Sequence, residues 1–404
     1  MNIIIFYTSN NREKKMTLRR IAIIATICFF GMGLLVSQAN AFEGEYKVGA
    51  VFSVTGRASF LGDPEKKTVE MLAEKINAAG GINGKKLELV IYDDEGDATK
   101  CNLAVKKLIT RDKVCAVIGP SLSGLSLAVI PVAEQNKTPL VSCAASYKIV
   151  HNEKTGKPYH WVFKTPQSDS MAVKAIYTHL KNRGITKIAI MSVTTGYGAS
   201  GRSELIRLAP EFNMNIIADE KYGPKDTDMT AQLTKIKGMA PAAIVNWSIG
   251  PTQVTMIRNW KDLGMTAIPL YQSHGFGSRK NIELAAGAAE GVLCPLGACN
   301  IAELLPADHP QKSVTMDYLK SYTAKYNEPL SSFGGHGWDA LQLVVDALSA
   351  AGDDKAAIRD YLEKKKGFVG QHGIFNFSPD DHNGLTKAAF SMVIVKDNDW
   401  ALVD

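Results

Sequence analysis

The sequence has no block of like charges, no metal-ligand cluster and none of the short motifs that mark common enzyme classes. No Cys/His cluster has the spacing of a zinc site, so a bound metal is not expected. The patterns G-x-S-x-G and H-E-x-x-H are absent, and so is the phosphate-binding loop with its lysine. These absences argue against an enzyme and against a resident cofactor.

Charge is nearly balanced over most of the chain. The net charge is +6 for 404 residues, but the first 41 residues hold five basic residues and one acid, which leaves +2 for the remainder. Without a basic block, nucleic acid is not an expected partner.

The first 41 residues contain an uncharged hydrophobic run. Basic residues at positions 14–20 precede this run, which covers residues 21–36, and an A-x-A site ending at Ala41 follows. This order is that of a secretory signal peptide, and the run is short for a membrane span. We therefore expect cleavage after Ala41 and a periplasmic mature protein, with a retained membrane anchor as the less favoured alternative.

Five cysteines follow this segment, an odd number for a protein of an oxidising compartment. Cys294 and Cys299 flank four residues and are the pair we expect to form any disulfide, although spacing alone does not fix the geometry.

Beyond residue 44, apolar strands alternate with helices, which is typical of a mostly parallel sheet covered on both faces. The first series has a helix opening at Asp63-Pro64, helices over 99–110 and 123–135, and strands over 47–53, 87–92, 114–118 and 139–142. The second has helices over 170–182, 202–211, 229–237 and 252–263, and strands over 185–192, 215–221, 242–247 and 268–272. Beyond Pro295 we expect helices over 311–326, 338–350 and 354–364 and strands over 374–377 and 390–396.

The alternation predicts an α/β protein with two doubly wound, Rossmann-like lobes. Ligands of open α/β sheets bind at the carboxyl ends of the strands, so the cleft between the lobes is the expected binding place. Ser121 and Ser123 follow one such strand, and Ser142 and Ser146 lie at the end of the next. Each pattern can bind a carboxylate or phosphate at a helix N-terminus, but each can equally be a simple helix cap.

Residues 196–201 fit the pattern G-x-G-x-x-G after a strand and before a helix. Asp219 and Glu220 lie about 20 residues further on, where an acid that binds ribose would be placed. The same glycines suit any tight strand-to-helix turn, and free NAD is not expected outside the cytoplasm. An exported dinucleotide-binding enzyme is therefore an alternative, but not the favoured one.

The ordered series of turns resembles the type I periplasmic ligand-binding proteins of the branched-chain amino acid family, which serve ABC importers. The resemblance covers essentially the whole mature chain and rests on Ser53-Val54-Thr55-Gly56 with Gly62, the run from Glu74 to Gly84, Tyr92-Asp93-Asp94, Gly119-Pro120 with Ser123, and Ala144-Ala145-Ser146. It implies two lobes joined by a three-strand hinge. Lobe 1 would comprise residues 45–166 and 296–376, and lobe 2 residues 167–295 and 377–404.

The resemblance also implies the ligand site. Ser123 would hold the ligand carboxylate, with backbone and hydroxyl contacts from Ala144 and Ser146. Asp169 matches an acid at the entry to the second lobe. Tyr197, inside the glycine motif, would stack on the ligand or hydrogen-bond to it.

One position departs from the family pattern. Members that bind amino acids commonly place an acid where this chain has His274, and a buried ammonium needs a negative partner that neutral histidine cannot supply. Either Asp169 pairs with the amine alone, or the ligand carries no amine, or His274 merely borders the cleft. Leu61 and Trp247 predict an apolar or aromatic pocket, although Trp247 would serve equally as a core residue.

The sequence thus predicts a monomeric solute-binding protein that captures a small hydrophobic carboxylate and docks on a membrane ABC permease. The ligand would be a branched-chain amino acid or an amine-free aromatic or branched acid. The remaining alternative is a ligand sensor of the same fold coupled to a signalling partner.

Overall fold

The computed structural model describes residues 42–403, and the structural statements below concern this part of the chain. The signal peptide and cleavage site expected over residues 1–41 lie outside it. Within residues 42–403 no helix combines the length and the apolar character needed to cross a membrane.

The first sheet has five parallel strands in the order β2-β1-β3-β4-β5. These are β1 (Glu45–Phe52), β2 (Lys86–Asp93), β3 (Ala116–Ile118), β4 (Leu140–Ser142) and β5 (Val162–Lys164). Every residue of β3, β4 and β5 is buried, as expected for parallel strands covered on both faces.

Helices from both ends of the chain cover this sheet. On one face, Val48 and Ala50 share a core with Val344 of a much later helix, and on the other face Val51 packs with Val105 and Val129. The helices are α2 (Ser59–Ala78), α3 (Ala98–Thr110), α4 (Ser123–Gln135), α11 (Ser332–Ala351) and α12 (Lys355–Lys364). A further helix, α10 (Lys312–Tyr326), packs against α2 and α11.

The second sheet has seven strands in the order β14-β13-β10-β9-β8-β6-β7. Five are parallel, namely β6 (Lys187–Val193), β7 (Asn215–Tyr222), β8 (Ala243–Trp247), β9 (Leu270–Gln272) and β10 (Leu293–Leu296). The two at one edge are antiparallel, β13 (Ser391–Lys396) and β14 (Asp399–Leu402). Its helices are α5 (Asp169–Asn182), α6 (Gly196–Leu208), α7 (Thr230–Gly238), α8 (Pro251–Asp262) and α9 (Arg279–Ala285).

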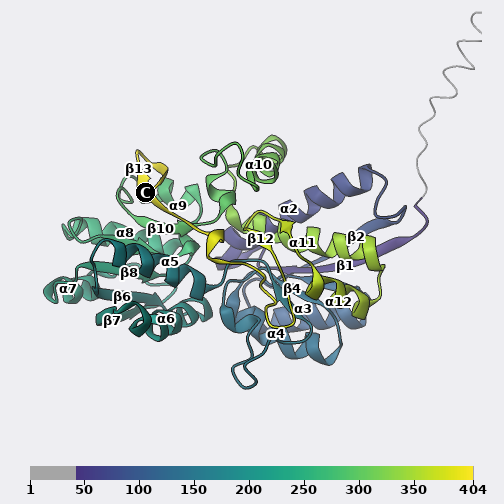
Figure 1. The fold of residues 1–404 in the computed structure, drawn as a ribbon, viewed down its shortest axis with the longest axis horizontal. Coiled ribbons are helices and arrows are strands. Elements are labelled where there is room, and N and C mark those ends of the chain that lie inside the picture. Colours follow the sequence, from purple (N-terminus) through teal and green to yellow (C-terminus); the bar gives the residue numbers. More distant parts are fainter. Residues whose placement is uncertain (1–41, 404) are drawn as a thin grey trace, which may run out of the picture. The chain divides into compact units, whose positions relative to one another are not determined.

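The two sheets occupy separate halves of Figure 1, with α5–α8 around β6 and β8, and α3, α4, α11 and α12 around β1 and β4. A two-stranded ribbon, β11 (Phe368–Val369) with β12 (Ile374–Phe375), lies outside both sheets. The predicted α/β class with two helix-covered parallel sheets is confirmed.

The chain passes between the sheets three times: after β5, after β10 and before β13. The side chain of Gln167 lies where these passages meet. Its Nε2 donates to the carbonyl oxygens of His372 (3.1 Å) and Ala389 (2.9 Å), and a Cβ on Gly297 would lie 2.4 Å from this nitrogen. One amide therefore contacts all three passages.

Three helices begin earlier than the sequence predicted. α2 begins at Ser59 rather than at Asp63-Pro64, α6 at Gly196 rather than at residue 202, and α11 at Ser332 rather than at 338. Proline and glycine are poor inside helices, which is why these starts were placed too late. Tertiary packing overrides that preference, since Leu61 and Phe333 bury in one cluster.

The cysteine prediction is wrong. All five cysteines within residues 42–403 are unpaired. Cys294 lies in β10 and packs in the core of the second sheet, whereas Cys299 packs with Tyr318 and Tyr322 of α10. The two side chains belong to different hydrophobic clusters, so the four-residue spacing does not bring them together.

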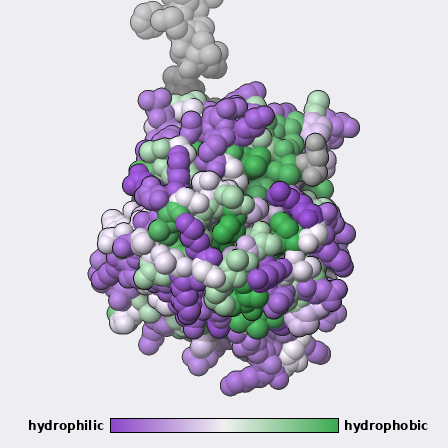
Figure 2. Space-filling model, turned by 90° about the vertical axis from the view of Figure 1, so that its left-hand side faces the viewer, coloured by the Kyte–Doolittle hydropathy of each residue, from purple (hydrophilic) through white to green (hydrophobic). Residues whose placement is uncertain are grey.

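Figure 2 shows one face of the molecule, on which hydrophilic residues predominate and hydrophobic areas are separate. The most exposed of the large hydrophobic side chains is Leu103 of α3, which is 63% exposed. The others lie on different elements, for example Leu284 on α9 and Leu402 on β14.

Candidate functional site

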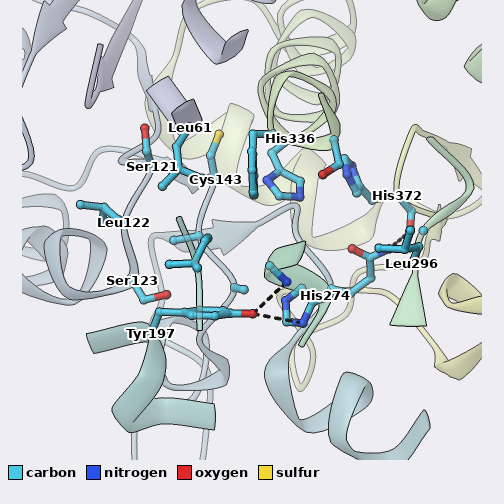
Figure 3. Close-up of a pocket in the computed structure, with 18 of the residues that line it drawn as sticks. Leu61, Ser121, Leu122, Ser123, Cys143, Tyr197, His274, Leu296, His336 and His372 are labelled. Carbon is cyan, nitrogen blue, oxygen red and sulfur yellow. Dashed lines mark hydrogen bonds between the residues drawn. The ribbon is translucent and has the colours of Figure 1, made fainter. Parts of the chain in front are cut away.

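A pocket lies between the carboxyl-terminal ends of the two sheets. It encloses about 540 Å³ of space between protein atoms, part of which is open to solvent. Among its lining residues none is Asp, Glu, Lys or Arg. Figure 3 shows Ser121, Leu122 and Ser123 on one side and His274, His336 and His372 on the other. The pocket is therefore uncharged at its wall and polar at two ends.

The first polar end is the N-terminus of α4. The residue before the helix, Leu122, makes no side-chain cap, so the N–H groups of the first turn have no partner from a capping side chain. Ser121 and Ser123 line the pocket beside them, and both are almost fully buried. Aligned peptide dipoles give such a helix end partial positive charge. This end can hold an anion without a lysine or arginine.

A tight loop from β3 positions this end of α4. Gly119 has φ of +92°, and a Cβ there would lie 2.0 Å from the carbonyl oxygen of Val51. Only glycine fits, and the chain then turns directly into Ser121 and Ser123. The Oγ of Ser123 accepts the N–H of Ser146 (3.3 Å), which fixes the loop after β4 against α4.

A buried carboxyl group supports Ser121 from behind. Ser121 donates to Oε2 of Glu65 and accepts the N–H of Ser53 at 3.1 Å. Burial raises the pKa of Glu65 well above its ordinary value, and the hydrogen bond from Ser121 opposes this shift. Glu65 is not among the lining residues, so its role here is to position Ser121.

Tyr197 reaches the pocket from the N-terminus of α6. Its Oη donates to Oγ of Ser273 (3.0 Å) and accepts the N–H of Gly275 (3.2 Å), and Nδ1 of His274 lies 3.4 Å away. Burial raises the pKa of the phenol, so it is neutral at physiological pH. Because the phenol hydrogen is donated to Ser273, the phenol oxygen can only accept further hydrogen bonds. The ring of Tyr197 lies at the pocket (Figure 3).

The glycines of the G-x-G-x-x-G motif serve packing. A Cβ on Gly198 would lie 1.8 Å from the carbonyl oxygen of Val193, and one on Gly201 would lie 2.0 Å from the indole nitrogen of Trp247. Asp219, predicted as the ribose-binding acid under the enzyme alternative, pairs through both oxygens with Nε of Arg202 (2.9 and 2.8 Å). Glu220 pairs with Lys235. These contacts account for the motif without a dinucleotide.

Three histidines form the second polar end, of which His336 and His372 are buried and His274 is half-buried. His274 lies in the short helix η4 (His274–Phe276), His336 in α11, and His372 between β11 and β12. The rings of His336 and His372 lie 4.1 Å apart. Burial lowers the pKa of His274 to about 3 and that of His336 well below its ordinary value, with smaller effects from the cation of Lys164 and from His372. His274 and His336 are therefore neutral at physiological pH.

Each of these histidines keeps a buried ring nitrogen without a hydrogen-bond partner among the described residues. These atoms are Nε2 of His274, Nδ1 of His336 and Nε2 of His372. An unpaired buried polar atom costs roughly 1–3 kcal/mol. Three of them around one pocket leave this end of the wall with unused hydrogen-bonding capacity.

Asp169 does not line the pocket. Its Oδ1 accepts the N–H groups of Tyr147 (3.0 Å) and Ser170 (2.9 Å), and its Oδ2 accepts the hydroxyl of Ser200. Burial raises the pKa of Asp169, opposed by Ser200 and by Lys164, whose own pKa burial lowers to about 7. This carboxyl group joins the loop after β4 to α5 and α6.

Ser146 and Trp247 also lie behind the wall. The Oγ of Ser146 is 2.6 Å from Oγ of Ser200. Trp247 is fully buried, with its ring 6.0 Å from that of Tyr197 and 5.8 Å from that of His274. The other five predicted site residues line the pocket, namely Leu61, Ser123, Ala144, Tyr197 and His274.

Sequence reasoning missed His336, His372 and Gln167, all of which line the pocket. His336 is the fifth residue of α11 and stands among the glycines at the start of this helix. A histidine flanked by Gly335 and Gly337 was the available signal. His372 had no such signal, because it follows β11 more than 30 residues later.

No group of histidine, cysteine, aspartate and glutamate within residues 42–403 is arranged to hold a metal ion.

Comparison with known proteins gives consistent results. The family model described as "Periplasmic binding protein" matches residues 45–399. A leucine-, isoleucine-, valine-, threonine- and alanine-binding protein from Pseudomonas aeruginosa is 24% identical over 344 residues, covering 84% of this chain and 86% of that protein.

Two solved structures are similar over the same region. An extracellular ligand-binding receptor from Rhodopseudomonas palustris HaA2 has a TM-score of 0.82 and 30% identity, covering 89% of this chain and 99% of that chain. The branched-chain amino acid transporter substrate binding protein LivJ from Streptococcus pneumoniae, in complex with isoleucine, has a TM-score of 0.74 and 26% identity, covering 89% and 100%.

Proposed function

The chain belongs to the periplasmic binding protein family, and from this premise we propose that it captures a small hydrophobic carboxylate for an ABC importer. The ligand occupies the pocket between the two sheets, and the protein delivers it to a membrane permease. Relatives named for binding leucine, isoleucine and valine support the transport role.

The observation that carries this proposal is the uncapped N-terminus of α4 at the pocket wall. The hydroxyl group of Ser123 and the N–H groups of the first turn border the pocket together, while Ser121, held by Glu65 and Ser53, lines the wall beside them. A carboxylate there accepts several hydrogen bonds in a site from which water is largely excluded, where electrostatic interactions are strong.

The remainder of the wall suits a hydrophobic ligand body. Its apolar side chains come from both sheets: Leu61, Leu122, Ile249, Leu296, Phe333 and Phe390. Leu61 and Phe333 belong to one cluster with Ile249, which joins the two halves at the pocket. A ligand that contacts these residues from both sides favours the closed arrangement.

The test is ligand binding by the mature protein and a Ser123→Ala variant. The protein is refolded without ligand and screened by thermal shift against leucine, isoleucine, valine and their amine-free analogues, followed by calorimetry. At least one carboxylate should raise the melting temperature. Ser123→Ala should weaken it by about tenfold or more, since hydrogen bonds to charged groups contribute about 1.5–3 kcal/mol.

Ser349→Ala is the matched control, because this exposed serine on α11 donates only to the carbonyl of Val345. It should bind as the unmodified protein does. Failure of every carboxylate to bind, or full affinity in Ser123→Ala, would contradict the proposal.

We further propose export with cleavage after Ala41, a monomeric mature protein and a permease partner. Deleting the gene should abolish uptake of the ligand found above. Unchanged uptake would instead favour the ligand-sensing alternative.

A further inference from the structure

The histidine end of the pocket contains more hydrogen-bond acceptors than donors. Three buried ring nitrogens there have no partner, and they come from η4, α11 and the segment between β11 and β12. Which of them accept and which donate follows from the partner of the other ring nitrogen. This pattern restricts the chemistry of the ligand group at that end.

Asp339 determines the proton position on His372. Nδ1 of His372 lies 3.0 Å from Oδ2 of Asp339, which also accepts the N–H of His372 at 3.0 Å. Oδ1 of the same carboxylate accepts the N–H of Gln371 at 2.6 Å. A carboxylate surrounded by donors requires the hydrogen on Nδ1. Nε2 of His372 has no hydrogen-bond partner among the described residues, and its side chain is only 2% exposed.

Tyr197 determines the proton position on His274 in the same way. The hydrogen of Tyr197 is directed to Ser273, so the phenol oxygen faces Nδ1 of His274 as an acceptor. The ring hydrogen therefore lies on Nδ1, and Nε2 of His274 is a second unpaired acceptor.

Two amides at this end add acceptors of the same kind. Gln167 uses both hydrogens of Nε2 on the carbonyls of His372 and Ala389, and Asn300 donates to the carbonyl of Gly277 at 2.8 Å. Their oxygen atoms accept no hydrogen bond from the described residues. The ligand group that meets this end must therefore bring its own hydrogen.

A hydroxyl group meets this requirement better than an ammonium group. No carboxylate lines the pocket, and the oxygens of Asp169 and Asp339 are engaged by neighbouring donors. The buried Lys164 adds positive charge close enough to act on His274 and His336. A cation there would be buried without a negative partner, which is costly, whereas a neutral hydroxyl is not.

We propose that the ligand is a carboxylic acid with a hydroxyl group at the end remote from its carboxylate, and that this hydroxyl donates to Nε2 of His372. This inference rests on the proposed function, in which the carboxylate lies at α4. A ring hydrogen on Nδ1 of His336 would complete the contacts of the hydroxyl oxygen.

The experiment uses matched acids that differ only at the remote end. Calorimetry on ligand-free mature protein compares 6-hydroxyhexanoate, hexanoate and 6-aminohexanoate, and likewise 4-hydroxybenzoate, benzoate and 4-(aminomethyl)benzoate. In at least one series the hydroxy acid should bind about tenfold or more tightly than both counterparts. An acid without the hydroxyl group leaves a buried acceptor of the pocket unpaired. Leucine, isoleucine and valine are measured alongside.

Two substitutions locate the effect at His372. His372→Asn keeps a donor for Asp339 in the place of Nδ1 but has no atom at the place of Nε2. His372→Gln places an amide oxygen near the position of Nε2. The ratio of the affinities for the hydroxy acid and its parent acid should fall to about one in His372→Asn and be partly retained in His372→Gln.

The outcomes separate this inference from the proposed function. Equal binding of the hydroxy acid and its parent acid, or tighter binding of an amino acid, overturns the inference and leaves the proposed function standing. Binding of no carboxylate at all overturns both. An unchanged hydroxyl preference in His372→Asn would show that the hydroxyl group does not bind to His372. If His372→Asn fails to fold, the affinities of the three acids for the unmodified protein still test whether the pocket prefers a hydroxyl group.

Discussion

Two neutral histidines, His274 and His336, contribute to the chemical character of the pocket wall. Their burial holds them in the uncharged form, so each presents a directional nitrogen rather than a charge. Neutral, oriented acceptors distinguish ligands by hydrogen bonding. A ligand that lacks one hydrogen-bond donor then leaves one nitrogen of the pocket wall without a partner, and it binds more weakly.

The burial of His274 has a measurable consequence for stability. Its pKa is about 3 in the folded protein against an ordinary value of 6.5. Between these values the unfolded chain binds a proton that the folded protein does not, so the free energy of unfolding decreases as pH falls from 6.5 towards 3. For one such residue the slope is about 1.4 kcal/mol per pH unit.

His274→Asn tests this slope, since asparagine keeps a donor for Tyr197 but does not titrate. Urea unfolding at pH 7, 5.5 and 4 should show that the variant loses less stability on acidification than the unmodified protein. The unmodified protein is the more stable at pH 7, and the difference should shrink as pH falls. Parallel pH profiles would mean that His274 already carries a proton when folded.

Single residues also show the limits of sequence reasoning. Ser123, Tyr197 and His274 were predicted because they occupy defined places after strands, and all three line the pocket. The part played by Asp169 could not be predicted, because it depends on Ser200 of another helix and on the loop at Tyr147. His372 reaches the pocket through a contact with Asp339 that no local pattern records.

At the level of elements, hydrophobic patterns predicted most strands and helices within a few residues. α4 begins and ends where predicted, and β7 extends the prediction by one residue. Strand β10 was not predicted, because its four residues include Pro295 and proline is unusual in an inner strand. It also missed β14 and α9, which are short.

Glycine accounts for the errors at helix starts. In α6 and α11 glycines lie in the first turns, where they cost helix propensity but allow close packing. A Cβ on Gly201 would lie 2.0 Å from Nε1 and 2.1 Å from Cε2 of Trp247. The indole therefore lies directly on the backbone of α6, and the helix is attached to its sheet through this contact.

Gly201→Ala should destabilise the protein by about 1–3 kcal/mol, because the added methyl overpacks a buried contact. Chemical denaturation gives the free energy of unfolding. A second change, Trp247→Leu, removes the indole and should make Gly201→Ala nearly neutral when the two are combined. Gly238→Ala, at a helical glycine with open space around its Cβ position, is the control and should change stability little. Equal effects at Gly201 and Gly238 would contradict the packing role.

At the scale of the whole molecule, the pocket is closed by contacts between the two sheet halves. The first turns of α4 and α6 meet, and a Cβ on Gly196 would lie 2.9 Å from both Cα and N of Gly124. Ser146 and Ser200 make a hydrogen bond across the same boundary, and Phe60 lies against Gly250. Gln167 links the three chain passages behind the pocket.

This arrangement connects ligand binding to closure. The three passages are the only covalent links between the halves within residues 42–403, and Gln167 both bridges them and lines the pocket. A ligand that contacts both halves binds the closed form more tightly than the open form and therefore stabilises the closed form. The backbone contact between Gly124 and Gly196 sets how far the halves approach.

Gly196→Ala should therefore weaken ligand binding without destabilising the ligand-free protein. Gly196 has helical backbone geometry, so alanine is tolerated within α6, but its methyl would meet backbone atoms of α4 that cannot move aside. We expect the affinity to fall by about tenfold, equivalent to about 1.4 kcal/mol, while the melting temperature without ligand stays the same or rises slightly.

Gly124→Ala is the matched control across the same contact. A Cβ on Gly124 would lie 3.9 Å from Cα of Gly196, an ordinary van der Waals distance, so this methyl does not obstruct approach. Calorimetry gives the two affinities, and small-angle scattering with saturating ligand should show incomplete compaction only for Gly196→Ala. Equal affinity in the two variants would mean that the halves need not approach this closely to hold the ligand. A lower melting temperature of ligand-free Gly196→Ala would instead mean that Gly196 is needed for the stability of α6.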